Sequence, residues 1–259
     1  MKTTLEELEA KLDALVEEFH KARIKKTGTL KLDDVIKKKN PYLFKAKGLN
    51  SVAEIVKSLL DATISSSEET LFGETMEKLA IFICQKEKGG MKSGIEGIDL
   101  EFSEDDGNTR YLISVKSGPN WGNSNQINRM KDEFSKAKKT LRTNNNDPRF
   151  NIICVNGCCY GKDNNPDKGD YFKYCGQEFW KLISGNPDFY KDILEPFEKN
   201  AKDQNAQFEE EYQKMINKFS GEFCNKYCKE DGSIDWDKIL EINSAKTVKK
   251  PADDPSDIS

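Results

Sequence analysis

The feature that most constrains the fold is a change from helical to alternating sequence patterns near residue 97. Residues 97–102 (GIDLEF) and 109–118 (TRYLISVKSG) alternate as β-strands, and residues 103–108 (SEDDGN) carry the Asp-Gly signal of a hairpin turn. A basic helical pattern at 126–143 and a short apolar strand at 150–157 follow. This order predicts an α/β fold in which helices flank a mixed sheet.

Helical patterns precede this core. Apolar residues recur at spacings of three and four near the N-terminus, which predicts an amphipathic helix with a narrow apolar seam. The seam consists of Leu5, Leu8, Leu12, Leu15, Phe19 and Ala22. It either packs against its own domain or forms a dimer contact. Two further helices are expected at 51–64, capped by Ser51, and at 68–85, with a break at 65–69.

These patterns divide the chain into four consecutive segments. Residues 1–66 are expected to form a helical, basic segment, which we consider for dimerisation and for contact with a polyanion, and residues 67–200 are expected to form the α/β core. Residues 201–248 are expected to add C-terminal helices. Residues 249–259 lack a hydrophobic pattern, so we expect a disordered tail.

Positive charge is concentrated near the N-terminus. Residues 21–47 contain ten Lys or Arg and two Asp, a local charge of +8 in a chain of net charge −4. Because neutralising phosphates needs only local charge, this stretch suggests a site for a polyanion, with Lys37, Lys38 and Lys39 as candidate contacts. The alternative is a solvated, lysine-rich surface.

The single histidine excludes several catalytic classes. Serine-hydrolase triads, Cys-His nucleophile pairs and HExxH zinc sites would all have to use His20. His20 lies between charged residues at the end of the first predicted helix, so we expect it on the surface. Any chemistry must therefore run on carboxylates, lysines and thiols.

The cysteines and the N-terminus bear on the compartment. The charged N-terminus is not a signal peptide, and no run approaches the roughly 18 apolar residues of a membrane span. We therefore expect a soluble, cytoplasmic protein with free thiols. Cys84 and Cys154 lie in apolar runs and are expected in the core. A zinc site is the alternative for the group Cys154, Cys158, Cys159 and Cys175, although a CxxC spacing is missing.

The hairpin carries the most informative pair of side chains. Asp99 lies near the start of the first strand and Lys116 near the end of the second, so the hairpin places them at the same end of the sheet. An Asp and a Lys in this arrangement can be an ordinary cross-strand pair. The same end also carries Ser117, Gly118 and a polar loop at 119–126, which favours an active site.

At these residues the sequence resembles a known family. An aspartate on one strand with x-x-K on the next, inside an α-β-β-α-β unit, resembles the PD-(D/E)XK phosphodiesterase superfamily. Longer strings are similar to type II restriction endonucleases of the group that cuts a partly degenerate site with a GGNCC core. These strings are GIDLEF, ISVKSGPNWGNSNQIN and CYGK…CGQEFWKLISGN…LEPF. The resemblance covers roughly residues 70–200, about half of the chain.

The resemblance implies a fold and an activity. It implies a restriction-endonuclease-like core and Mg²⁺-dependent hydrolysis of double-stranded DNA at a specific palindromic site, with Mn²⁺ as a substitute. A two-fold symmetric site implies a homodimer. Restriction function also implies a partner methyltransferase that acts on the same site.

Roles follow for the residues that match the motif. Asp99 matches the metal-binding aspartate and Lys116 the lysine that positions or deprotonates the attacking water. Val115 would lend its backbone carbonyl to the metal. Ser114 departs from the motif, because Asp or Glu is usual there and a hydroxyl is a poor ligand for Mg²⁺.

Three acids could replace the missing carboxylate. We favour Glu77, which lies in Gly73-x-x-x-Glu77 like the first-helix glutamate of many superfamily members. Glu101 shares a strand face with Asp99. Glu133 lies on the following helix, where some restriction enzymes with a similar Ser-x-Lys motif keep a displaced glutamate. Each is otherwise a solvated carboxylate.

DNA contacts are expected from two regions near this site, and the basic segment at 21–47, with Lys37, Lys38 and Lys39, is a candidate DNA clamp. The helix at 126–142 is basic and suits a track for the DNA backbone. Asn120, Asn123 and Gln126 can exchange hydrogen bonds with base edges, although each can also be a turn residue.

Three other functions remain open from the sequence. A repair-type nuclease of the same fold would cut without strict site specificity. A DNA-binding protein could have lost catalysis, with Ser114 as the sign of loss. A helical assembly protein could use the N-terminal seam, and Asp99 and Lys116 would then be a structural pair.

Overall fold

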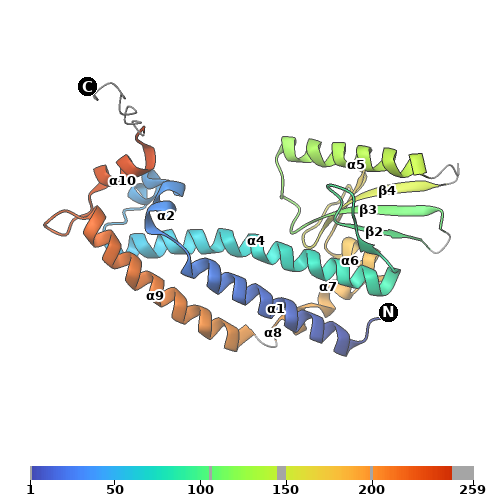
Figure 1. Ribbon diagram of the computed structural model, residues 1–259, viewed down its shortest axis with the longest axis horizontal. Coiled ribbons are helices and arrows are strands. Elements are labelled where there is room, and N and C mark those ends of the chain that lie inside the picture. Colours follow the sequence, from blue (N-terminus) through green and yellow to red (C-terminus); the bar gives the residue numbers. More distant parts are fainter. Residues whose placement is uncertain (1, 105–106, 145–149, 199–200, 247–259) are drawn as a thin grey trace, which may run out of the picture. The chain divides into compact units, whose positions relative to one another are not determined.

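The computed structural model describes residues 2–104, 107–144, 150–198 and 201–246 (Figure 1). The chain forms two compact units, each discontinuous in sequence. Unit 1 comprises Met1–Arg23 and Glu68–Phe208, and unit 2 comprises Ile24–Ser67 and Glu209–Ser259. The four segments predicted from the sequence, in contrast, are each one consecutive stretch of the chain. The predicted tail at 249–259 lies outside the described residues.

Three helices contribute residues to both units. They are α1 (Leu5–Gly28), α4 (Val52–Lys88) and α9 (Ala201–Tyr227). Because each of these helices continues across a unit boundary, the units do not coincide with consecutive segments of the chain. No helix in the described part of the chain is long and apolar enough to cross a membrane.

Unit 1 is built on a mixed sheet, which confirms the predicted fold class. In the described residues its strands follow the order β1-β2-β3-β4-β5. The pairs β1–β2 and β2–β3 are antiparallel, whereas β3–β4 and β4–β5 are parallel. The strands are β1 (Met91–Lys92), β2 (Leu100–Ser103), β3 (Thr109–Lys116), β4 (Asn151–Cys158) and β5 (Phe172–Cys175).

The β2–β3 hairpin forms where the alternating pattern predicts it. Its turn uses Gly107, whose φ of +69° favours glycine, and the Gly107 N–H donates to the carbonyl of Glu104 at 2.9 Å. Residues 105–106 of the predicted turn lie outside the described residues. The register pairs Leu100 with Ile113, so Asp99, which directly precedes β2, lies opposite Ser114.

One face of the sheet is covered by α5 (Ser124–Asn144), the helix that connects the parallel strands β3 and β4 (Figure 1). Phe134 and Ala137 of this helix are buried against Leu112 of β3 and Cys154 of β4. Since side chains alternate along a strand, Ser114 and Lys116 share the face of Leu112. The α5 helix therefore lies on the face of the sheet that carries Lys116, the lysine of the predicted site.

The other face packs on a second helical layer. Ile113 and Val115 of β3 share a core with Leu79 and Ile83 of α4. The same core contains side chains of α6 (Gln177–Ser184) and α7 (Phe189–Asp192), which precede α8 (Leu194–Glu198). The α1 seam also packs here, through Leu8, Leu12 and Leu15. Of the two alternatives for the seam, packing within its own unit is therefore the one found.

The predicted break at residues 65–69 is wrong, because α4 is continuous through it. The stretch contains serines and glutamates but neither Gly nor Pro. The Ser67 hydroxyl does not compete with the helix, because it donates to the Thr63 carbonyl one turn earlier. Thr63, just before the stretch, donates to the Leu59 carbonyl in the same way. The predicted cap is confirmed, since the Ser51 hydroxyl accepts from the Glu54 N–H and the Glu54 carboxylate accepts from the Ser51 N–H.

Unit 2 is helical in its described residues. Beside parts of α1, α4 and α9 it contains α2 (Leu32–Lys38), α3 (Pro41–Ala46) and α10 (Trp236–Ser244). Its helices are joined by polar side chains as well as apolar packing. Tyr227 donates to Asp33 at 2.9 Å. The Asn243 amide donates to the carbonyl of Ile36, in the last turn of α2, and to that of Lys39, which directly follows the helix.

The expected surface position of His20 is wrong, because only 8% of its surface is exposed. His20 continues the buried i, i+4 row of Leu8, Leu12 and Val16, and its charged sequence neighbours lie on other faces of α1. Burial, with a smaller contribution from Arg23, lowers the pKa of His20. The core positions of Cys84 and Cys154 are confirmed, and burial raises the pKa of the Cys84 thiol to about 12.

Candidate active site

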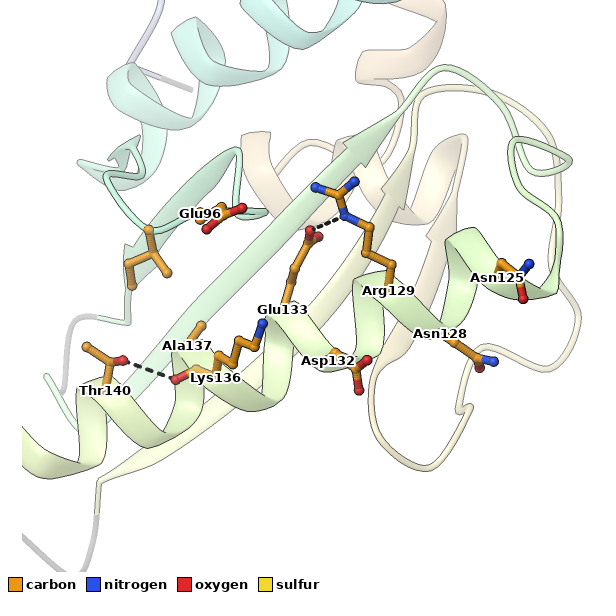
Figure 2. Close-up of a pocket in the computed structure, with 10 residues that line it drawn as sticks. Glu96, Asn125, Asn128, Arg129, Asp132, Glu133, Lys136, Ala137 and Thr140 are labelled. Carbon is orange, nitrogen blue, oxygen red and sulfur yellow. Dashed lines mark hydrogen bonds and ion pairs between the residues drawn. The ribbon is translucent and has the colours of Figure 1, made fainter.

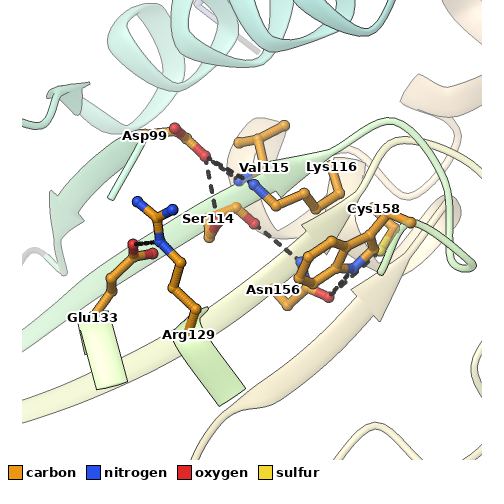
Figure 3. A network of polar contacts seen from close by, with 9 residues as sticks. Asp99, Ser114, Val115, Lys116, Arg129, Glu133, Asn156 and Cys158 are labelled. Atoms are coloured by element: carbon orange, nitrogen blue, oxygen red, sulfur yellow. Dashed lines mark hydrogen bonds and ion pairs between the residues drawn. The ribbon is translucent and has the colours of Figure 1, made fainter. Parts of the chain in front are cut away.

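The hairpin brings Asp99 and Lys116 together, as its predicted register requires (Figure 3). The Asp99 N–H donates to the carbonyl of Ile113 at 2.9 Å, which continues the β2–β3 pairing to the residue before β2. The Lys116 Nζ lies 3.9 Å from the Asp99 Oδ2. Their side chains are 30% and 26% exposed, so both polar ends remain accessible from solvent.

The Asp99 carboxylate is oriented by β3. Its Oδ2 accepts the Val115 N–H at 2.7 Å and the Ser114 hydroxyl at 3.4 Å. Ser114 is only 2% exposed, so the serine side of this contact is shielded from solvent. In an antiparallel pair the N–H and C=O of one residue point to the same side. The Val115 carbonyl therefore faces the side of β3 on which Asp99 lies.

Glu77 on α4 belongs to the same electrostatic environment. Burial raises the pKa of its carboxyl group, and the negative charge of Asp99 raises this pKa further. Lys92 and Lys116 act in the opposite direction on the Glu77 pKa. The charges of Asp99 and Lys116, from the hairpin, thus act on the Glu77 carboxyl group of α4 at this end of the sheet.

Glu101 shares the strand face of Asp99 but pairs elsewhere. Its residue surface is 7% exposed, and its Oε2 lies 3.1 Å from the Nη2 of Arg110 on the neighbouring strand. Arg110 also donates to the Ser103 hydroxyl at 3.1 Å. The Glu101 carboxylate is therefore part of a cross-strand ion pair toward the turn of the hairpin.

Glu133 on α5 lies beside the chain that leads into Asp99. Its Oε1 accepts from the Arg129 Nε at 2.8 Å, and the two side chains point toward each other (Figure 2). A Cβ atom at Gly97 would lie 2.4 Å from the Glu133 Oε2, so only glycine leaves room for this carboxylate. Glu133 and Arg129 line a groove of about 470 Å³ on α5. The other lining residues are Ile95, Glu96, Asn125, Asn128, Asp132, Lys136, Ala137 and Thr140.

The donor set fits a divalent cation with incomplete protein ligation. Among the described residues, no three Asp, Glu, His or Cys side chains converge closely enough to enclose a metal. Mg²⁺ is commonly held by one or two carboxylates, and water and substrate phosphate complete its coordination. Asp99, Glu77 and the Val115 carbonyl match that pattern. A cation between the two acids would also relieve the repulsion that raises the Glu77 pKa.

The polar residues after β3 have local structural partners. Asn120 is exposed in the turn that follows β3. Asn123 and Gln126 form a reciprocal cap at the start of α5: the Asn123 Oδ1 accepts from the Gln126 N–H at 3.1 Å, and the Gln126 Oε1 accepts from the Asn123 N–H at 3.0 Å. Both remain exposed. For Asn123 and Gln126, the alternative role as turn residues is therefore supported by these two hydrogen bonds.

The candidate lysines of the basic segment lie in unit 2. Lys37 and Lys38 are exposed in the last turn of α2, where their charge complements the C-terminal end of the helix. Lys39 is partly buried, and its Nζ donates to the carbonyl of Ala62 at 2.9 Å. Lys37 and Lys38 are therefore more accessible to a polyanion than Lys39.

Sequence reasoning missed one polar residue behind the site. Asn156 is 1% exposed and lies on β4, in register with Ser114. Its Nδ2 donates to the Ser114 carbonyl at 3.3 Å, and its Oδ1 accepts from the Trp121 Nε1 at 3.0 Å. The sequence signal for this residue is an asparagine within an otherwise apolar predicted strand. An amide buried at such a position needs hydrogen-bond partners.

Comparison with known proteins gives one family. A family model described as type II restriction endonuclease EcoO109I matches residues 6–205, which is 200 of the 259 residues. The match includes Glu77, Asp99 and Lys116. No match is found among curated proteins. The extent of the family match, over a chain with the expected sheet, shows that this protein belongs to the type II restriction endonuclease EcoO109I family.

Proposed function

We propose that the protein hydrolyses phosphodiester bonds in double-stranded DNA at a specific palindromic site, in a Mg²⁺-dependent reaction. Membership of a restriction endonuclease family supplies the reaction class. The observation that carries the proposal is the Asp99–Lys116 pair, whose charged groups lie 3.9 Å apart and partly exposed at the end of the hairpin. A carboxylate for metal binding and an ammonium for the phosphate are the groups that this chemistry needs.

Each residue of the pair has a distinct role in the proposed reaction. Asp99 and Glu77 would hold Mg²⁺, or Mn²⁺ in its place, with the Val115 carbonyl as a further ligand. The chemistry that the bound ion supplies is a lower pKa for the attacking water and stabilisation of charge on the phosphate oxygens. Lys116 orients the water and offsets negative charge that develops on the phosphate. Ser114 and the Val115 N–H hold the Asp99 carboxylate in place.

DNA binding is assigned to exposed cations and amides. The α5 helix presents Arg129 and Lys136 along its groove, and Lys37 and Lys38 are exposed on unit 2. These groups suit contacts to phosphates, which position the duplex without reading its sequence. Base readout is proposed for Asn120 and, beside their capping bonds, for Asn123 and Gln126, since exposed amides can donate to and accept from base edges.

Two partners follow from the proposed substrate. A palindromic duplex presents two scissile phosphates related by a two-fold axis, so we propose a homodimer with one active site for each strand. A site-specific DNA endonuclease would also cut the genome that encodes it. We therefore propose a companion methyltransferase that modifies the same recognition site.

The test is digestion of phage DNA by the purified protein, with and without Mg²⁺ or Mn²⁺. Asp99→Ala and Lys116→Ala are compared with Asp188→Ala and Lys191→Ala. The second two variants break another Asp–Lys pair, 2.7 Å apart and exposed, at a distance in sequence from the hairpin. We expect discrete, metal-dependent fragments that disappear only in the first two variants.

Other outcomes identify the alternatives. Metal-dependent cleavage without discrete fragments indicates a nuclease that lacks strict site specificity. DNA binding without cleavage under all conditions indicates a site that has lost catalysis, with Ser114 as the physical reason. Absence of DNA affinity at low salt, where phosphate contacts are strongest, would contradict the proposal altogether and favour an assembly role.

A further inference from the structure

We propose that Trp121 and Asn156 are positioning residues that fix the Lys116 ammonium group at the reaction centre. This inference rests on the proposed function, because it assumes that Lys116 acts on the phosphate or the attacking water. It adds two residues outside the sequence motif, one in the loop after β3 and one on β4.

The Lys116 ammonium lies close to both a carboxylate and an aromatic ring. Its Nζ is 3.9 Å from the Asp99 Oδ2 and 5.3 Å from the centre of the Trp121 ring. A lysine side chain is a long, flexible stem, so its charge is not positioned by the backbone alone. Contact with an aromatic face within about 6 Å is attractive for an ammonium group. The ring therefore gives the ammonium a second attractive contact besides Asp99.

Asn156 fixes the orientation of the indole ring. The Trp121 Nε1 donates to the Asn156 Oδ1 at 3.0 Å, and the Asn156 Nδ2 donates to the Ser114 carbonyl at 3.3 Å (Figure 3). These two bonds use opposite ends of the amide, so a flipped amide would face a donor with a donor. Because Asn156 lies within a strand paired in register with β3, the support comes from the sheet that carries Lys116.

The backbone near Trp121 is anchored independently of the indole. Lys173 on β5 donates to the Pro119 carbonyl at 2.8 Å. Gly118 packs so closely on Tyr160 that an added Cβ would lie 2.3 Å from its ring. The loop therefore has other contacts that hold its path. Changes at the Trp121 side chain are expected to alter the position of Lys116 without unfolding the loop.

The test combines single-turnover cleavage at saturating DNA with separate measurement of the DNA Kd. Trp121→Leu removes the aromatic face, whereas Trp121→Phe keeps an aromatic face and loses the indole N–H. A small displacement of a reacting group can cost about 100-fold in rate, so we expect Trp121→Leu to lower the cleavage rate constant by about 10- to 100-fold. The Kd should stay unchanged, and Trp121→Phe should recover part of the rate.

A double-variant comparison tests the connection through Asn156. Asn156→Leu removes the acceptor for the indole and should lower the cleavage rate constant. In a Trp121→Phe background that bond is already absent, so Asn156→Leu should cost less than it does alone. Trp236→Leu is the matched control. It breaks another lysine–tryptophan contact, in which the Lys45 Nζ lies 4.9 Å from the Trp236 ring, within unit 2.

The outcomes separate this inference from the function on which it rests. If Lys116→Ala abolishes cleavage but Trp121→Leu cleaves at the unaltered rate, positioning by Trp121 is wrong and the proposed function stands. If Lys116→Ala itself cleaves normally, the assigned role of the lysine fails first. An increase in Kd with an unchanged rate constant would make Trp121 a DNA contact instead. Circular dichroism checks folding, and Trp121→Phe remains the decisive variant if Trp121→Leu does not fold.

Discussion

Removing the Arg110 guanidinium is expected to destabilise unit 1, because it leaves the Glu101 carboxylate buried without its counter-ion. The two charged groups lie 3.1 Å apart, and the Glu101 and Arg110 side chains are 9% and 25% exposed. Removing one partner of a buried ion pair typically costs about 3–5 kcal/mol. Because Arg110 is partly solvated, the lower end applies, and Arg110→Met should lower the free energy of unfolding by about 3 kcal/mol.

The assay is urea unfolding at pH 7, followed by tryptophan fluorescence. Trp180 is 1% exposed in the core of unit 1 and reports on its packing. Lys191→Met is the control, since it breaks a pair with Asp188 whose side chains are 62% and 57% exposed. Exposed pairs contribute about 0–1 kcal/mol, so this variant should unfold near the urea concentration of the unmodified protein.

A double variant of Glu101 and Arg110 provides a second test of this prediction. Replacing both charges with hydrophobic residues of similar volume is often neutral, so the Glu101→Leu and Arg110→Leu double variant should regain most of the stability lost in Arg110→Met. A loss below about 1 kcal/mol in Arg110→Met would refute the reasoning, because it would mean that Glu101 is effectively solvated. Glu101 would then again be available as the acid that replaces the missing motif carboxylate.

Three other predictions address pKa and capping. Burial and Asp99 raise the pKa of Glu77, so the folded state holds this proton more tightly than the unfolded state. The stability of the metal-free protein should therefore fall as pH rises above about 4.3. In thermal melts with EDTA, Glu77→Gln should be more stable than the unmodified protein at pH 7, and this difference should disappear in acid. The same variant should lose DNA cleavage. Burial lowers the pKa of His20, so stability should fall as pH drops below about 6.5, and His20→Leu should show a flatter pH dependence of its urea midpoint. Asn123→Ala should cost about 1 kcal/mol in urea unfolding through loss of the α5 cap, and an unchanged DNA Kd would exclude it as a base contact.

The parts of the site that local sequence determines were predictable. Alternation and the Asp-Gly turn specify the hairpin, and a hairpin leaves little freedom in register. The approach of Asp99 to Lys116 follows from that register alone. The α5 helix and β4 were equally predictable, because the periodicity of each lies within one continuous stretch of sequence.

Features that depend on tertiary packing were not predictable in the same way. His20 has charged neighbours in sequence, yet its position on α1 continues a buried row. The strand β5 has only the residues Phe172–Cys175, and it pairs in parallel with β4, so no hairpin signal marks it. The support that Asn156 gives to Trp121 joins residues 35 positions apart and depends on the pairing of β3 with β4.

The serine at position 114 is physically consistent with a carboxylate supplied by α4. Ser114 is 2% exposed and contacts the Asp99 Oδ2 at 3.4 Å, so an acid at this position would place two buried negative charges side by side on the sheet. A hydroxyl stabilises the Asp99 carboxylate instead. In the proposed site the second carboxylate would be that of Glu77, on a helix that packs on the opposite face of the sheet. Glu77 is only partly buried, and burial together with the charge of Asp99 raises the pKa of its carboxyl group. In the proposed function the two acids would hold Mg²⁺ from separate elements, so the site would depend on the packing of α4 against the hairpin.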